Sequence, residues 1–227
     1  MATLQYLGHA AFYLEGQGIK ALFDPFLSGN PLASEGPEVR PILDYIFVSH
    51  AHDDHLGDTE AIARRTGAVV VATNELALYL EGKGLKTIAM HVGGRVSLSF
   101  GRVKLTPALH GSSVSENGRV VCADQPCGFL VEVEGKKIYH AGDTGLSMEM
   151  SLLAAEEVEV AILPIGGHYV MDAEDAARAV ELIRPKITVP VHYDTFPSIR
   201  ADPVGFARKA GGLTEARVLR PGESLHF

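Results

Sequence analysis

Short apolar runs alternate with turn signals over the first third of the chain. The segments LQYLG, AFYLEG and KALFDPF are rich in aliphatic and aromatic residues and are closed by glycine or by Asp-Pro, which is typical of an antiparallel meander. The longer run ILDYIFVSH predicts a buried strand that ends at a histidine. Two helical segments, 58–67 and 74–84, flank the predicted strand AVVVA, and Asp58 is expected to cap the first helix.

The remaining two thirds of the chain return to strands and then to helices. The runs RVSLSF, VKLTPALH, GFLVEVEG and KKIYHAGD predict strands, with a hairpin turn at Gly135. The strands VEVAILPIGG and ITVPVH then alternate with two helices, and Asp172 is the expected N-cap of the first. No long polar linker separates these parts. We therefore expect one domain, 1–227, in which helices cover two packed sheets.

Composition and charge narrow the classes of function. The chain has 227 residues, of which 46% are apolar and 21% charged, as in ordinary globular proteins. The net charge of −8 without a basic cluster argues against nucleic-acid binding. The absence of an apolar stretch of ~18 residues argues against a membrane span. The amino terminus lacks a basic leader, so we expect a cytoplasmic protein.

The segment HAHDDH, residues 50–55, is the strongest chemical signal in the sequence. His50 and His52 are two positions apart at the end of a predicted strand, so both imidazoles can reach one ion. Asp54 and His55 follow on the turn and can reach a second position. So many ionisable groups would repel or desolvate one another unless a cation organised them. The alternative is a solvated surface loop, which would not explain matching residues elsewhere.

Three further residues of the ligand type follow predicted strands downstream. His110 ends VKLTPALH, Asp143 ends IYHAGD and His192 ends ITVPVH. Loops at the carboxyl ends of strands commonly gather into one site. Imidazole and carboxylate ligands suit zinc, manganese, iron or nickel, and the lack of a thiolate weakens a purely structural zinc site. The sequence therefore predicts a metal centre.

These motifs together resemble those of a known family. HAHDDH matches the HxHxDH signature of the metallo-β-lactamase-fold superfamily, and His110, Asp143 and His192 match its remaining ligand positions in order. LGHAAFYLEG, ALFDPFLSGNP, HAGDTGL, PIGGHYVMD and PVHYDTFP are similar to a subgroup of small stand-alone metal-dependent hydrolases related to L-ascorbate-6-phosphate lactonase. The resemblance spans essentially the whole chain. It implies the α+β class and an αββα four-layer sandwich with the site at one edge of the sheets.

The resemblance also implies a dinuclear centre and a reaction. Two divalent ions, with zinc as the first expectation and manganese, nickel or iron as alternatives, would share a bridging hydroxide that attacks the substrate. That substrate is expected to be a small ester, lactone or phosphoester. The first ion would take His50, His52 and His110, the second would take Asp54, His55 and His192, and Asp143 would bridge them.

Other residues near the expected site have two interpretations each. His9 would either contact substrate or a metal ligand, or cap a turn. His168 and Tyr169 would either bind substrate or an oxyanion, or belong to a loop before the Asp172 cap. Asp24 would orient a ligand histidine or cap the turn at Pro25. We treat His9, His168 and Asp54 as the catalytic candidates, with Asp54 also shuttling a proton to the leaving group.

Two other functions remain open at the level of sequence. One is a phosphodiesterase or nuclease, and the other is a metal-bearing protein on the same fold that binds without catalysis. The expected partner is a small-molecule substrate, with neither nucleic acid nor membrane, and a homo-oligomer is left open.

Overall fold

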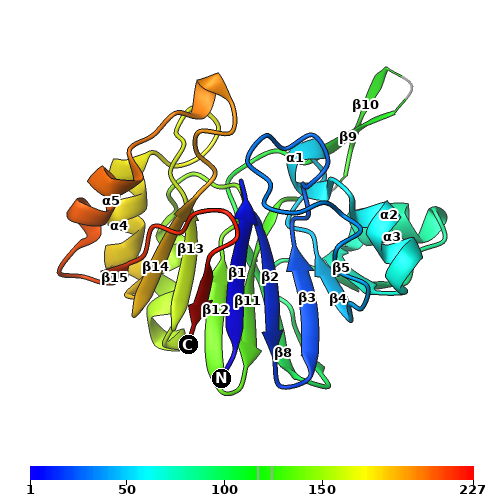
Figure 1. The fold of residues 1–227 in the computed structure, drawn as a ribbon, viewed down its shortest axis with the longest axis horizontal. Coiled ribbons are helices and arrows are strands. Elements are labelled where there is room, and N and C mark those ends of the chain that lie inside the picture. The colour runs from blue at the N-terminus through cyan, green and yellow to red at the C-terminus, as the bar shows by residue number, and fades with distance from the viewer. Residues whose placement is uncertain (117, 124) are drawn as a thin grey trace.

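Two seven-stranded β-sheets pack face to face in the computed structural model, which describes residues 1–116, 118–123 and 125–227 (Figure 1). Helices pack on the outer face of each sheet, so the layers follow the order helix, sheet, sheet, helix. The predicted α+β class and αββα sandwich are confirmed. The predicted meander is also found, because the first three strands pair antiparallel in sequence order.

The first sheet has the strand order β16-β1-β2-β3-β4-β5-β6. Strands β1 and β3 both pair antiparallel with β2 and therefore run in the same direction, and β3, β4, β5 and β6 pair parallel. The strands of this sheet are β1 (Thr3–Gly8), β2 (Ala11–Gly16), β3 (Ile19–Phe23), β4 (Tyr45–Phe47), β5 (Val69–Thr73), β6 (Thr87–Met90) and β16 (Ser224–His226).

The second sheet has the strand order β15-β14-β13-β12-β11-β8-β7. Strands β8 and β12 both pair antiparallel with β11, and β12 to β15 pair parallel, so these strands share one direction. The strands of this sheet are β7 (Arg95–Leu98), β8 (Gly101–Pro107), β11 (Cys127–Val133), β12 (Lys136–His140), β13 (Val160–Pro164), β14 (Ile187–Val191) and β15 (Glu215–Ala216).

The helices and one separate hairpin complete the fold. Strands β9 (Ser113–Glu116) and β10 (Arg119–Cys122) pair with each other outside both sheets and project from the body of the molecule (Figure 1). No helix in the described part of the chain is long and apolar enough to cross a membrane. The helices are α1 (Asp53–Leu56), α2 (Thr59–Thr66), α3 (Asn74–Gly82), α4 (Ala173–Ile183), α5 (Pro203–Ala210) and the 3₁₀ helices η1 (Met148–Glu156) and η2 (Pro197–Ile199).

Several local predictions are confirmed and others are corrected. Asp172 caps α4 as predicted, since its side chain accepts hydrogen bonds from the amides of Glu174 and Asp175. Asp58 precedes α2, but its carboxylate accepts from the amides of Leu27 and Ser28 instead of capping the helix. Strand β6, the β9–β10 hairpin and η1 were not predicted. Strand β10 is exposed along its whole length and β6 is only partly buried, so burial imposes little apolar alternation on them.

The space between the sheets is filled by aliphatic and aromatic side chains. Phe23, Phe47 and Phe129 are fully buried there, with ring centroids 4.7 Å apart for the first two and 5.3 Å apart for Phe47 and Phe129. Aromatic contacts of this kind contribute beyond the area that they bury. This layer fixes the relative position of the two sheets and hence of the loops at their edges.

Truncation in this layer should destabilise the fold. We expect Phe129→Ala to lower the free energy of unfolding by about 3–5 kcal/mol, because it leaves a cavity between the sheets. Leu152→Ala is the control, since Leu152 is 69% exposed, and should change stability by less than about 0.5 kcal/mol. Urea denaturation followed by circular dichroism measures both. Equal effects would show that the inter-sheet layer is not the main packing element.

Candidate metal centre

Strand direction brings the predicted ligands to one place. His50 follows β4, His110 follows β8, Asp143 follows β12 and His192 follows β14. The carboxyl ends of β1, β3 and β4 share one edge of the first sheet, and those of β8, β12, β13 and β14 share one edge of the second. All seven residues predicted as ligands lie in groups whose potential ligand atoms are within 4.8 Å of one another. His9, which follows β1, joins them.

These residues form three overlapping groups. One group is centred on the first histidine pair, one on Asp143, and one on Asp54 and His9. The groups are His50, His52 and His110; His50, His55 and Asp143; and His9, Asp54, His55 and His192.

The side chains of HAHDDH, which leads into the short helix α1, differ in their burial. His50 and His55 are fully buried and His52 is partly buried. Asp54 lies partly buried among the cluster, whereas the adjacent Asp53 is exposed. The motif therefore contains one carboxylate that faces the ligand cluster and one that faces solvent.

Asp143 lies at the centre of the cluster. Its Oδ1 is 3.1 Å from Nε2 of His55, and its Oδ2 is 3.0 Å from Nε2 of His192 and 3.5 Å from Nε2 of His110. The residue is only 3% exposed. One carboxylate thus faces three imidazoles contributed by two different sheets, a placement compatible with the predicted bridging position.

Several of these buried atoms have no hydrogen-bond partner. They are His55 Nε2, Asp143 Oδ1 and both ring nitrogens of His192. Buried polar atoms are nearly always paired, and an ion is one of the few explanations for a converging set that is not. Nitrogen and oxygen donors of these types suit divalent transition ions. The residues present therefore fit the metal centre that the sequence predicts.

A buried carboxylate behind the cluster orients two of the imidazoles. Asp24 accepts hydrogen bonds from the amide and the hydroxyl of Ser49, each at 2.7 Å, and from Nδ1 of His55 at 2.8 Å. The Ser49 hydroxyl also lies 3.0 Å from Nδ1 of His50. This arrangement directs the Nδ1 protons of His50 and His55 toward Ser49 and Asp24 and turns each Nε2 toward the cluster, where its lone pair could bind a cation. Of its two interpretations, the structure favours orientation of a ligand histidine for Asp24.

Burial and neighbouring charge shape the protonation of the cluster. Burial opposes ionisation of Asp143, yet His55 and His192 hold its pKa well below the usual range. Burial would lower the pKa of His55, but Asp143 and Asp24 raise it well above the ordinary value. Burial and the adjacent His55 lower the pKa of His50. The cluster thus holds ionised carboxylates ready to pair with positive charge.

His9 supports Asp54 from behind. Its Nε2 is 3.2 Å from Asp54 Oδ2, its Nδ1 is 2.9 Å from the hydroxyl of Thr195, and its ring centroid is 4.1 Å from that of His192. Burial lowers the pKa of His9 to about 4. A neutral imidazole that accepts from Thr195 donates its Nε2–H to Asp54, so the contact to Asp54 is the one that the structure favours over a turn cap.

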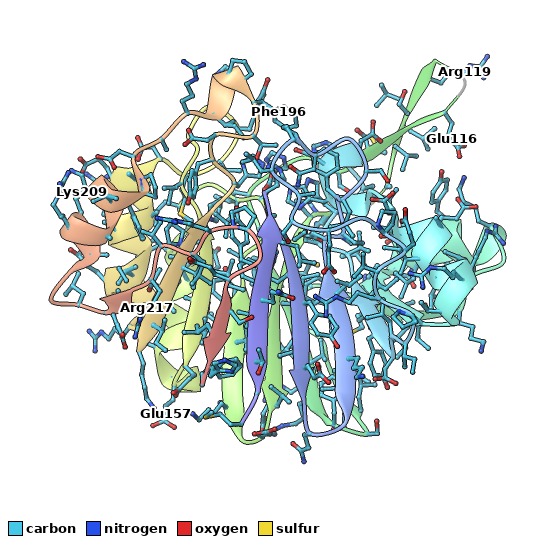
Figure 2. All side chains as sticks on the ribbon, in the orientation of Figure 1. Glu116, Arg119, Glu157, Phe196, Lys209 and Arg217 are labelled. Atoms are coloured by element: carbon cyan, nitrogen blue, oxygen red, sulfur yellow. The ribbon has the colours of Figure 1, made fainter. Side chains whose placement is uncertain are left out.

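A cavity of about 350 Å³ opens onto the cluster. Its floor contains five of the predicted ligands, and its walls come from the loops after β13 and β14. The described residues that line it are His52, Asp54, His110, Asp143, Tyr169, His192, Phe196 and Ser198. Phe196 lies at the same end of the molecule as α1 (Figure 1, Figure 2).

His168 is the catalytic candidate that the structure does not bring to the cavity. It is exposed and its ring packs edge-on against Tyr169, with centroids 4.3 Å apart. Gly166, two positions before it, must be a glycine for a structural reason. A Cβ on Gly166 would lie 2.2 Å from the carbonyl oxygen of His192, so glycine lets this loop approach β14 and not the substrate.

Three residues of the site, Ser49, Phe196 and Ser198, were not predicted from the sequence. Each is one to six positions from a predicted ligand, in VSH and in PVHYDTFPS, so adjacency to the motifs was the available signal. Adjacency alone does not say whether a side chain points to the cavity. That direction depends on loop backbone, such as the positive φ angles of 56° at His192 and 60° at Asp194.

The two aspartates of HAHDDH provide a matched pair for testing the cluster. We expect Asp54→Ala to reduce the divalent metal retained after dialysis, because its carboxylate belongs to the ligand group. Asp53→Ala should retain the wild-type amount, since Asp53 is exposed. Elemental analysis of both variants measures the difference. Equal metal content would contradict the assignment of Asp54.

Asp24 should control metal affinity through His55. We expect Asp24→Asn to weaken zinc binding by about 10–100-fold, because the amide pairs less well with Nδ1–H of His55 and with Ser49. Asparagine tolerates the positive φ of 41° at this position. Asp44→Asn is the control, since Asp44 also accepts a backbone N–H, that of Lys20, but is exposed. Competition with a chromogenic chelator measures affinity, and unchanged affinity would contradict the orienting role.

Comparison with known proteins places this geometry in a family. Residues 3–192 match the family described as the β-lactamase superfamily domain. A UPF0173 metal-dependent hydrolase of Alkaliphilus metalliredigens is 50% identical over 227 residues, which cover 99% of each chain, and one of Carboxydothermus hydrogenoformans is 51% identical over 98% of each. The structure of Igni18, a metallo hydrolase from the archaeon Ignicoccus hospitalis, is 40% identical with a TM-score of 0.89, covering 100% of this chain and 99% of that one. The chain therefore belongs to the β-lactamase superfamily, among its UPF0173 metal-dependent hydrolases.

Proposed function

We propose that this metal-dependent hydrolase cleaves a small carboxylic ester or lactone at a dinuclear centre. His50, His52 and His110 would hold one divalent ion, zinc being the first candidate. Asp54, His55 and His192 would hold the other, with Asp143 between the two. The observation that carries this proposal is that buried atoms of His55, Asp143 and His192 converge beneath a 350 Å³ cavity and lack hydrogen-bond partners.

The chain's own residues would handle the proton. When bound, the divalent ions would activate a water molecule and polarise the scissile carbonyl. Asp54 lines the cavity, and contacts with His9 and His55 hold its pKa below the usual range despite burial. As an ionised carboxylate it can accept the proton that water loses on attack and pass it to the leaving oxygen. His9 and Thr195 keep the carboxylate in place for this transfer.

The cavity supports an ester or lactone over a nucleic acid. Among the described residues that line it there is neither lysine nor arginine. The chain as a whole carries a net charge of −8. A nucleic-acid backbone is normally neutralised by lysine and arginine side chains. The intact ligand set supports a catalytic protein over one that only binds.

Removal of metal should abolish the activity. We expect the protein stripped by dipicolinate to lose hydrolysis of phenyl acetate and dihydrocoumarin, and zinc or manganese to restore it. A pH-stat assay measures turnover, and elemental analysis before and after stripping verifies the metal content. Hydrolysis that persists at full rate in verified metal-free protein would contradict the proposal.

Asp54 should matter for the rate as well as for metal. With metal supplied in excess to restore occupancy, we expect Asp54→Asn to lower kcat by at least about 100-fold, because the amide cannot accept a proton. Asp53→Asn, changed in the same way one position earlier, should keep kcat. A fully metal-loaded Asp54→Asn protein with wild-type kcat would exclude the proton transfer proposed for Asp54.

A further inference from the structure

We propose that the substrate is an uncharged ester or lactone that carries an aromatic or other flat apolar group. This inference rests on the hydrolase function proposed above and adds the part of the substrate that does not react. The apolar group would lie between Tyr169 and Phe196, with the reacting carbonyl over the ligand cluster.

The walls of the cavity are largely aromatic. Above the ligand cluster the described lining consists of Tyr169, Phe196 and Ser198, that is, two aromatic rings and one hydroxyl. Aromatic side chains recognise flat apolar groups through offset or edge contacts and through the large area that they cover. A cavity of about 350 Å³ lies at the small end of the range for ligand sites, which begins near 300 Å³. It suits a compound of one or two rings.

The Phe196 side of the cavity is held in place by contacts within the protein. Its ring centroid lies 5.7 Å from that of His9 and 6.3 Å from that of Phe26. The loop that carries it is closed by hydrogen bonds from the amide of Asp194 to the carbonyl of Ile199, at 2.9 Å, and from the amide of Ile199 to the carbonyl of Phe196, at 3.1 Å. A ring held in this way loses little conformational freedom on binding, so it can discriminate between substrates.

The second aromatic residue of the walls leaves a large ring uncovered. Tyr169 is 56% exposed, on a loop anchored where the amide of Met171 donates to the carbonyl of Thr144 at 2.9 Å. Thr144 directly follows Asp143, so this wall is tied to the ligand cluster itself. Covering an exposed aromatic ring with an apolar group of the ligand removes a large apolar surface from water, which favours binding.

The described residues of the walls include neither lysine nor arginine. A phosphate or carboxylate on the non-reacting part of the substrate would lose water and find neither lysine nor arginine among the described lining residues. Only the ions at the reacting end would offer positive charge. The walls therefore select against substrates with a second, anionic group, including sugar phosphates.

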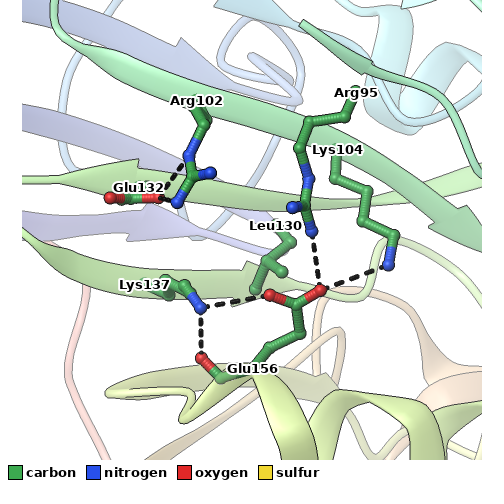
Figure 3. A pocket seen from close by; sticks show the side chains of 7 residues that line it. All are labelled: Arg95, Arg102, Lys104, Leu130, Glu132, Lys137 and Glu156. Carbon is green, nitrogen blue, oxygen red and sulfur yellow. Dashed lines mark hydrogen bonds and ion pairs between the residues drawn. The ribbon is translucent and has the colours of Figure 1, made fainter. Parts of the chain in front are cut away.

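One group of cations lies outside the cavity and is already paired with carboxylates. On the outer face of the second sheet, Glu156 contacts Arg95 at 2.7 Å, Lys137 at 3.1 Å and Lys104 at 3.3 Å (Figure 3). Arg102 pairs with a separate carboxylate, that of Glu132, at 2.8 Å. This cluster joins η1 to strands β7, β8 and β12 on the face of the sheet, away from the loops that form the cavity.

Matched substrates test the inference on the zinc-loaded protein. Each kcat/KM is divided by the alkaline hydrolysis rate of the same substrate, so that intrinsic reactivity does not enter the comparison. We expect the value for phenyl acetate to exceed those for 4-carboxyphenyl acetate and 4-acetoxyphenyl phosphate by at least about tenfold. The value for dihydrocoumarin should exceed that for γ-butyrolactone by a similar factor. Equal or better turnover of the anionic esters would overturn the inference and leave the hydrolase function standing. No hydrolysis of any ester or lactone by loaded protein would overturn both.

Variants of the walls separate recognition from folding. We expect Phe196→Ala and Tyr169→Ala each to raise KM for phenyl acetate by about tenfold with unchanged zinc content, whereas Leu152→Ala, an exposed apolar residue outside the cavity, changes neither. Ser198→Lys should shift the kcat/KM ratio toward 4-carboxyphenyl acetate, because it supplies the missing cation. A ratio that does not move in Ser198→Lys, together with unchanged KM in both aromatic variants, would refute the proposed placement.

Discussion

The contact of the Asp143 carboxylate with imidazoles from two sheets is the constraint on which the site depends. His55 and His192 lie 3.1 and 3.0 Å from its two oxygens, and all three residues are buried. Without a cation these largely buried groups would keep their charges or polar atoms incompletely paired, which costs free energy. The fold tolerates this cost only because the surrounding layers hold the loops in place. A bound cation would turn the same arrangement into a favourable one.

The loops that carry the ligands are held in place by parts of the molecule that never reach substrate. The aromatic layer between the sheets sets the distance between their edges, and parallel strand directions deliver the ligands to those edges. Asp24 and Ser49 then set the tautomers of His50 and His55 from behind. This division between a rigid support and a small reactive group is what preorganises a catalytic site.

The cavity above the cluster is lined by accessible loop residues, unlike the buried support behind the ligands. Its walls, Tyr169 and Phe196, are aromatic and accessible, and they come from the loops after β13 and β14. Such loops vary without disturbing the strands that carry the ligands. Specificity can therefore differ between proteins that share the metal centre, and the chemistry at the floor says little about the group bound by the walls.

The sequence by itself determined most strands and helices through apolar periodicity, and the seven candidate ligands through the HAHDDH spacing and the ligand-type residues that follow later strands, because these are local properties. The class of fold was implied by the resemblance of these motifs to the metallo-β-lactamase-fold superfamily. It did not determine strand β6, the β9–β10 hairpin or η1, which lack a strong apolar pattern. Nor could it decide between two interpretations of His9, Asp24 and His168. Only the tertiary structure placed His9 and Asp24 against the cluster and His168 in solvent. The direction of a loop side chain depends on backbone angles and on packing between segments far apart in the chain, and no local pattern of residues encodes these.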